Sequence, residues 1–118
     1  MRVAVVDGDG YFAVESFEGD ERAGLAYGHE LAHPDGDRTV LLYSLDVDER
    51  FRRRGHGRAV VEAFVAEAAR RGASEVWVLT DDGNPAGLAT YRSAGGERDQ
   101  VDQVMFTWPL ATTADSSH

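Results

Sequence analysis

The chain has 118 residues, 42% of them hydrophobic, and a formal net charge of −9, so it is long enough for one domain with a single core but not for two. The acidic balance excludes general nucleic-acid binding, which needs a basic surface, and permits a cationic substrate. The absence of cysteine excludes disulfides and thiolate chemistry and fits a reducing cytoplasm, and no apolar run approaches the ~20 residues of a membrane span.

The N-terminal third has the pattern of antiparallel strands. Short runs rich in β-branched and aromatic residues alternate with turn signals such as Asp7-Gly8-Asp9-Gly10. The pattern predicts strands over residues 3–6, 11–17, 23–31 and 39–47.

The second half alternates helices and strands. Apolar residues at three- and four-residue steps predict a helix over 59–71, ended by Gly72. A buried parallel strand is expected over 76–79, a short helix from Asn84 to about Ala94, and a last strand over 104–108. The order predicts an α/β (α+β) mixed sheet in one domain over 1–110, with 111–118 as a disordered tail. Three aromatic side chains are expected in the core: Tyr27, Trp77 and Trp108.

A basic, glycine-rich turn separates the fourth predicted strand from the first helix. Its sequence is Arg52-Arg53-Arg54-Gly55-His56-Gly57-Arg58. Glycine lets the backbone approach a ligand closely, and the first amides of a helix have no partner inside it and favour negative charge. The segment therefore predicts a site for a phosphorylated ligand, although two glycines also fit an ordinary tight turn.

These residues resemble the GNAT superfamily of acetyltransferases, whose signature Arg/Gln-x-x-Gly-x-Gly/Ala falls on Arg52, Gly55 and Gly57. A second match runs from Asn84 to Tyr91 and is followed by Gly95-Gly96, with Gly87 where the family often has alanine. Within the superfamily, residues 43–108 are most similar to the type I aminoglycoside 3-N-acetyltransferases. The resemblance implies the GNAT fold, acetyl-coenzyme A as cofactor, a small cationic amine (aminoglycoside-like or polyamine) as substrate, and a homodimer.

The resemblance also implies the site. Its cofactor contacts are Leu45, Val47, Arg52, Arg53, Arg54, Gly55, His56, Gly57, Arg58, Asn84 and Tyr91. Tyr91 matches the tyrosine that donates a proton to the departing sulfur. Asp46 is our candidate for the base that deprotonates the amine, with Ser44 as a neighbour that positions water.

The chain departs from the resemblance in two ways. The subfamily usually has an aspartate at the position of Ser44, so the base moves to Asp46, two residues on and on the same strand face. Family members also open with a strand and two helices that wall the acceptor site, and this chain begins too late to hold them. A protein or peptide amine as substrate and a coenzyme A-binding module without catalysis are therefore alternatives.

Each site residue also has a plainer structural interpretation. Asp46 would cap the loop or pair with one of the arginines at 50–54. Tyr91 would pack with Leu88 in the core, and Asn84 would serve only as an N-cap.

A rival motif lies at His29-Glu30-Leu31-Ala32-His33, which spells the His-Glu-x-x-His of zinc metallopeptidases. That chemistry needs a helix, so that both imidazoles share one face. Gly24 and Gly28 in this window and Pro34 directly after it disfavour a helix. We therefore expect no metal here, and we expect neither nucleic acid nor a membrane as a partner.

Overall fold

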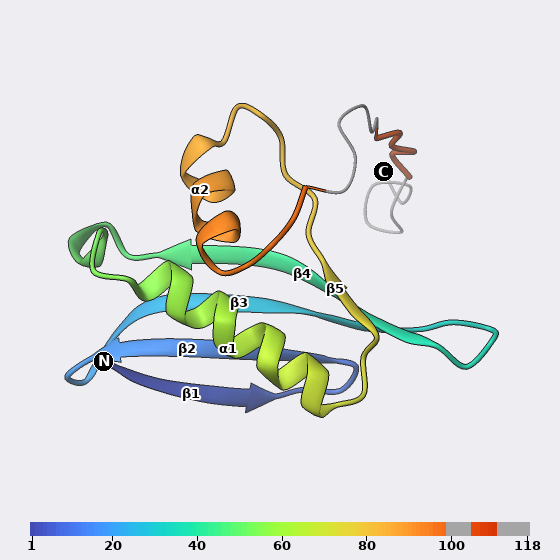
Figure 1. Cartoon of the computed structure of the whole chain (residues 1–118), viewed down its shortest axis with the longest axis horizontal. Coiled ribbons are helices and arrows are strands. Elements are labelled where there is room, and N and C mark those ends of the chain that lie inside the picture. The colour runs from blue at the N-terminus through green and yellow to red at the C-terminus, as the bar shows by residue number, and fades with distance from the viewer. Residues whose placement is uncertain (99–104, 111–118) are drawn as a thin grey trace, which may run out of the picture.

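The computed structural model describes residues 1–98 and 105–110, so the predicted tail over 111–118 lies outside the described residues. Its strands are β1 (Arg2–Asp7), β2 (Tyr11–Glu18), β3 (Glu21–Ala32), β4 (Arg38–Val47) and β5 (Glu75–Trp77). They form one sheet in chain order (Figure 1), in which β1 to β4 are antiparallel and β5 is parallel to β4. The helices are α1 (His56–Arg70) and α2 (Pro85–Ser93). Among the described residues, no helix has the length and hydropathy to span a membrane.

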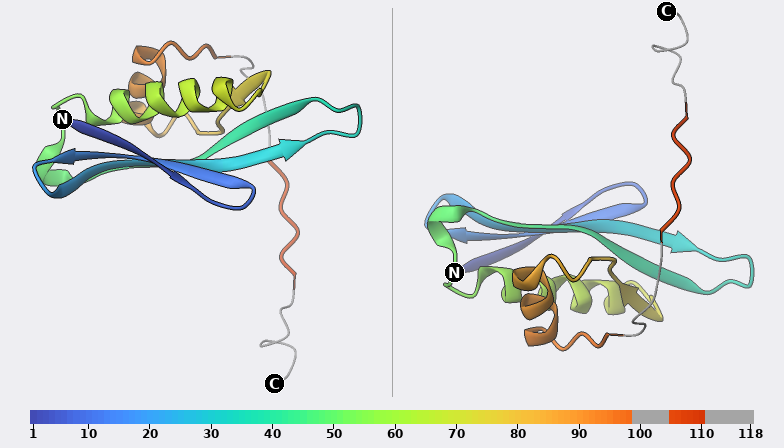
Figure 2. Two further views of the ribbon diagram at one scale, coloured as in Figure 1. Left: turned by 90° about the horizontal axis from the view of Figure 1, so that it is seen from below. Right: turned by 90° about the horizontal axis from the view of Figure 1, so that it is seen from above.

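The core lies between α1 and one face of the sheet. Phe64 of α1 stacks on Phe12 of β2, with ring centroids 4.5 Å apart and an interplanar angle of 20°. The other buried apolar side chains come from alternate positions of the strands and from helical steps along α1, as a sheet with one packed face requires. In the described part of the chain both helices lie on this side of the sheet (Figure 2).

A register shift in the β3–β4 pairing sets which side chains of β4 face the helices. Tyr27 pairs with Ser44, but its neighbour Gly28 pairs with Leu42. Tyr43 is the extra residue and is 63% exposed. Because one residue is inserted, Leu42 on one side of the bulge and Leu45 on the other both pack against the core. A Cβ on Gly28 would lie 1.9 Å from the Leu41 carbonyl oxygen, so only glycine fits at this bulge.

The predicted mixed sheet is confirmed, and so are the four N-terminal strands and both helices. Helix α1 begins at His56, three residues before the predicted start, because its first turn consists of polar and glycine residues without an apolar period. The predicted strand over 104–108 is wrong for residues 105–108, which form no strand, and Val104 lies outside the described residues. Alternating side chains alone do not make a strand without a neighbour to pair with.

The prediction that Tyr27, Trp77 and Trp108 lie in the core is wrong. Trp108 is 76% exposed. Tyr27 and Trp77 are only half-buried, and the Trp77 indole N–H donates to Thr39 Oγ1 at 3.4 Å.

Candidate active site

The basic loop follows β4 directly and lies at the surface. A 3-10 turn over Glu49–Phe51 begins it, and the Asp48 carboxylate accepts from the Arg50 main-chain N–H at 2.9 Å. Arg53 and Gly55 then adopt left-handed backbone, with φ of 64° and 85°. Nothing lies within 4 Å of a Cβ built on Gly55, so this position needs glycine for its backbone conformation and not for space.

The N-terminus of α1 leaves its first amides open. Gly55 is the N-cap residue and offers no side chain to them, and the first helical bond is Ala59 N–H to Gly55 O at 3.0 Å. Within the described residues, the N–H groups of His56, Gly57 and Arg58 have no acceptor. A helix end of this kind carries a positive partial charge and suits a bound anion.

Two exposed arginines add full positive charge to this helix end. Arg52 and Arg53 make no ion pair with any described residue, whereas Arg58 pairs with Glu62 at 3.0 Å. Exposed guanidinium groups beside open main-chain amides are the donor set that a diphosphate requires. The loop therefore fits the diphosphate of coenzyme A.

One edge of β4 is open next to this loop. Strand β5 pairs only with Thr39–Leu41, and the chain then leaves the sheet and runs to α2 (Figure 1). Residues 42–47 have no strand beside them on that edge in the described part of the chain. Unpaired main-chain groups on an open edge can accept a ligand that lies along the strand.

Gly57 brings three elements into contact. A Cβ at this position would lie 3.2 Å from Thr90 Cγ2 of α2 and 3.5 Å from Val47 Cγ2 of β4. The glycine therefore lets the start of α1 lie close to α2 and to the end of β4. A packing role for Gly57 thus holds whether or not the loop also binds a ligand.

Asn84 is the N-cap of α2, as one interpretation of the sequence had it. Its Oδ1 accepts from the Gly87 N–H at 3.1 Å, and its Nδ2 donates to Thr80 Oγ1 at 3.2 Å. A Cβ on Gly87 would lie 2.3 Å from Asn84 Nδ2, which explains glycine where alanine is frequent. The side chain is exposed, so a cofactor contact stays a prediction.

Tyr91 of α2 lies on the helix side of the sheet. It is half-buried, packs against the core, and lines a hollow of about 790 Å³ together with Leu42, Val61 and Leu88. Burial raises the pKa of the Tyr91 phenol. The phenol therefore stays protonated at neutral pH and can serve as an acid.

Asp46 lies on the opposite side of the sheet from Tyr91, because Leu45 and Val47 on either side of it face the helices. It is exposed, pairs across the sheet with Leu25, and lines a hollow of about 90 Å³. Asp46 makes no ion pair with a described residue.

The capping role considered for Asp46 belongs to its neighbour. Asp48 caps the 3-10 turn and pairs with Arg50 at 3.1 Å, and the hydrogen bonds from Arg50 lower the Asp48 pKa. Ser44 is half-buried beside Tyr27. Asp46 is therefore exposed and makes no ion pair with a described residue, so its role as a base stays a prediction.

Two predicted ligands of the loop have partners inside the protein. The His56 side chain is buried, with its Nδ1 2.7 Å from Ser16 Oγ and its Nε2 2.9 Å from Glu18 Oε1. Glu18 also pairs with Arg54 at 3.5 Å. Only the main-chain N–H of His56 remains for a ligand. No local pattern points to Ser16 or Glu18 as partners of His56, because they lie about 40 residues away along the chain.

The zinc motif does not form the helix that it needs. His29 and Glu30 lie on β3, where neighbouring side chains point to opposite faces, and His33 follows the strand. Glu30 pairs with Arg71, the C-cap of α1, at 3.3 Å, and His33 Nε2 lies 3.0 Å from Thr39 Oγ1. Among the described residues, no group of three potential ligands could hold a metal ion.

Comparison with known sequences identifies relatives of this chain. The model of the acetyltransferase (GNAT) family matches residues 3–95. A mycothiol acetyltransferase of Kocuria rhizophila is 34% identical over 103 residues, which are 85% of this chain and 33% of the relative. A ribosomal protein bS18-alanine N-acetyltransferase of Escherichia coli is 35% identical over 56 residues, 48% of this chain and 38% of the relative. The chain thus spans about a third of the length of these curated relatives.

Solved structures agree with this assignment. An aminoglycoside acetyltransferase from an uncultured soil metagenomic sample is 29% identical, with a TM-score of 0.76 over 88% of this chain and 68% of that one. An aminoglycoside N-acetyltransferase, AAC(6')-Iy, solved with coenzyme A, is 19% identical, with a TM-score of 0.74 over 87% of this chain and 78% of that one. That second likeness shows the fold alone. With the family match over residues 3–95, the signature loop and this fold, the chain belongs to the GNAT acetyltransferase family, whose acetyl donor is acetyl-coenzyme A.

Proposed function

We propose that this protein transfers the acetyl group of acetyl-coenzyme A to a primary amine of a small cationic molecule. The observation that carries the proposal is the uncapped N-terminus of α1, beside exposed arginines and the open edge of β4. Bound there, the cofactor supplies an acetyl thioester that is activated for attack by an amine.

The loop would hold the diphosphate. The main-chain N–H groups of residues 56–58 donate to its oxygens, and Arg52 and Arg53 neutralise its charge. The main-chain N–H of Val47, at the end of the open edge, would orient the acetyl carbonyl. A donor of this kind contributes roughly 2.7–4 kcal/mol to catalysis when it is aimed at the developing oxyanion.

Two side chains would handle the protons from opposite sides of the sheet. An alkylamine has a pKa of about 10.4 and arrives charged, so Asp46 would first hold the cation and then accept its proton at a carboxylate oxygen, directly or through a water held by Ser44. As the new C–N bond forms and the C–S bond breaks, Tyr91, whose phenol stays protonated, would donate its Oη proton to the departing sulfur.

The acidity of the chain supports a cationic acceptor. The net charge is −9, and Asp46 is an exposed carboxylate without a cationic partner among the described residues. The similar structure at 29% identity is an aminoglycoside acetyltransferase, which favours an aminoglycoside-like or polyamine substrate. A protein amine is the second candidate, because a ribosomal-protein acetyltransferase is similar over 56 residues.

An acceptor screen tests the proposal. Purified protein and acetyl-coenzyme A are mixed with aminoglycosides, polyamines and peptides, and the release of free thiol is followed. We expect turnover with a small polyamine or aminoglycoside, and we expect Asp46→Asn to lower kcat by about a hundredfold or more, the usual range for loss of a general base. Asp48→Asn is the matched control, because it removes a neighbouring carboxylate that only caps the loop.

The alternatives give different results in the same screen. Turnover with peptides alone favours the protein substrate. Tight cofactor binding without turnover on any amine favours a module that binds coenzyme A without catalysis. Absence of cofactor binding refutes the proposal. Light scattering on the same sample tests the homodimer that the family resemblance implies.

A further inference from the structure

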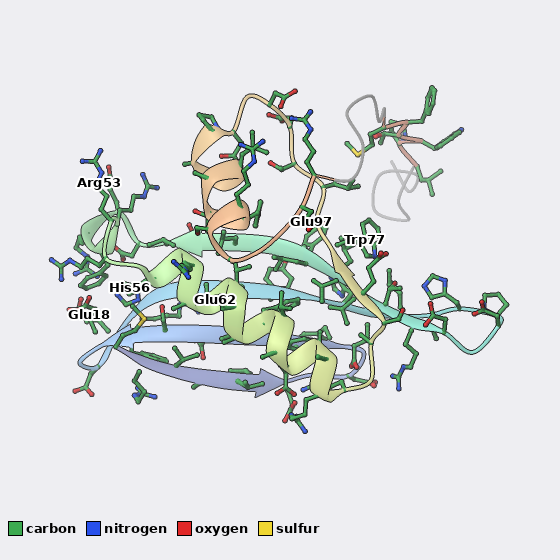
Figure 3. All side chains as sticks on the ribbon, viewed as in Figure 1. Glu18, Arg53, His56, Glu62, Trp77 and Glu97 are labelled. Atoms are coloured by element: carbon green, nitrogen blue, oxygen red, sulfur yellow. The ribbon has the colours of Figure 1, made fainter. Side chains whose placement is uncertain are left out.

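A buried polar network joins β2 to the start of α1 and to the basic loop before it. His56 is the first residue of α1 and is 1% exposed, and Ser16 of β2 is fully buried. The imidazole lies between the Ser16 hydroxyl at 2.7 Å and the Glu18 carboxylate at 2.9 Å. Figure 3 shows His56 and Glu18 close together beside the loop that carries Arg53. Two residues of one strand thus bind both nitrogens of the residue that begins the helix.

The chemistry of the three groups assigns the protons. The hydrogen bond from His56, followed by the charge of Arg54, lowers the Glu18 pKa, so this carboxylate is ionised and can only accept. His56 Nε2 therefore carries a hydrogen and donates it to Glu18. In a neutral imidazole Nδ1 is then the acceptor, and the Ser16 hydroxyl donates to it. Every polar side-chain atom of this buried network has a partner.

The space around the network is shaped to fit it. A Cβ on Gly24 of β3 would lie 2.6 Å from Ser16 Oγ and 3.4 Å from His56 Cβ, so glycine is needed for the serine and histidine to meet. A serine, a histidine and an acid also make up a hydrolase triad. Here the serine is fully buried and bonds to Nδ1, so no substrate can reach it. The network is a structural connection and not a second active site.

We infer that His56 is a positioning residue for the cofactor, held by Ser16 and Glu18 so that the first turn of α1 presents the amides of residues 56–58 to the diphosphate. The inference rests on the proposed function. Glu18 extends the same connection to the loop itself, because its carboxylate also pairs with Arg54. The C-terminal end of β2 therefore holds both the loop and the first residue of α1.

Substitution of His56 tests the inference through binding alone. His56→Leu removes both hydrogen bonds, and His56→Gln keeps one donor and one acceptor. We expect His56→Leu to weaken coenzyme A binding, measured by calorimetry, by about tenfold or more, the size of one hydrogen bond to a charged group. Pantetheine, which lacks the diphosphate, should bind with unchanged affinity. His56→Gln should recover most of the loss.

His33→Leu is the matched control. It removes a similar bond between an imidazole and a threonine hydroxyl, 3.0 Å long, at the opposite end of β4. We expect it to leave the affinity for coenzyme A unchanged. Glu18→Leu, at the half-exposed end of the network, removes the acceptor for His56 Nε2 and serves if His56→Leu does not fold; it should weaken coenzyme A and not pantetheine.

The outcomes separate this inference from the proposed function. If the natural protein binds coenzyme A and the substitutions at His56 and Glu18 leave that affinity unchanged, or weaken pantetheine equally, the positioning role is wrong and the proposed function stands. If the natural protein binds no coenzyme A, both the positioning role of His56 and the proposed function are wrong. Selective loss of coenzyme A affinity, with recovery in His56→Gln, establishes the positioning role.

Discussion

Replacing Gly55 by alanine changes the backbone energy of the basic loop and leaves the packing around this position unchanged. The residue has a φ of 85°, and nothing lies within 4 Å of the added Cβ, so no clash contributes. Left-handed backbone costs an L-residue about 1–2 kcal/mol. The smaller freedom of alanine in the unfolded chain offsets about 0.4–1 kcal/mol. The net cost to a loop that keeps its conformation is therefore about 1 kcal/mol.

The cost lowers either the stability of the free protein or its affinity for coenzyme A, depending on whether the free loop keeps its conformation. If the free loop keeps its shape, the free energy of unfolding falls by about 1 kcal/mol and coenzyme A affinity is unchanged. If the free loop relaxes, stability is kept and coenzyme A binds about fivefold more weakly, because binding must restore the strained backbone. In both cases the complex saturated with coenzyme A is about 1 kcal/mol less stable to unfolding than the natural complex.

Urea unfolding with and without saturating coenzyme A, together with calorimetric affinities, makes the measurement. Gly72→Ala is the matched control, because Gly72 ends α1 at its other terminus with a φ of 89° and equally open surroundings. It should lower stability by a similar amount with or without coenzyme A, and leave the affinity unchanged. The reasoning is refuted if the saturated Gly55→Ala complex is as stable as the natural one, or if Gly72→Ala weakens coenzyme A as much.

Three further substitutions test the acid, the charge network and the core. Tyr91→Phe should lower kcat more than it lowers the affinity for coenzyme A, and equal kcat in both proteins would contradict the acid role. Since burial raises the Tyr91 pKa, the natural enzyme should lose no activity through deprotonation of this phenol up to about pH 10. Hydrogen bonds from Arg70 and then Arg71 lower the Glu67 pKa, so Glu67 stabilises the fold above its ordinary pKa of about 4.3 and loses that contribution as pH falls through the lowered value. Glu67→Gln should therefore flatten the acid side of a urea-unfolding series, and an unchanged slope contradicts this. Phe64→Ala should cost about 3–5 kcal/mol of unfolding free energy, because the ring is fully buried and stacked; a loss below 1 kcal/mol in the same assay would show that the core refills the cavity.

The elements whose signals are local followed from the sequence. Strand alternation, the apolar period of α1 and the Asn84-Pro85 helix start each depend on neighbours within a few residues, and each agrees with the structure. The glycine-rich loop was likewise readable, because the left-handed backbone of Gly55 and an uncapped helix start are properties of that segment. These features are enough to predict a phosphate site between β4 and α1, and ligand binding there stays a prediction.

The roles of side chains depended on contacts between distant parts of the chain. The shifted register at Gly28 puts Leu42 and Leu45, which are three residues apart, on the same side of the sheet, whereas regular alternation along the strand predicts opposite sides for them. The last strand failed for the same reason, since pairing needs a neighbour that residues 105–108 do not have among the described residues.

His56 shows most directly what the amino-acid order determines and what it does not. Its position between two glycines at a helix start can be read from the sequence and predicts a segment that binds a diphosphate. That its ring turns inward to Ser16 and Glu18, and leaves only a main-chain donor for a ligand, is decided by folding. A hydrogen bond between residues 40 positions apart forms only when α1 packs on the sheet, because no local preference encodes it.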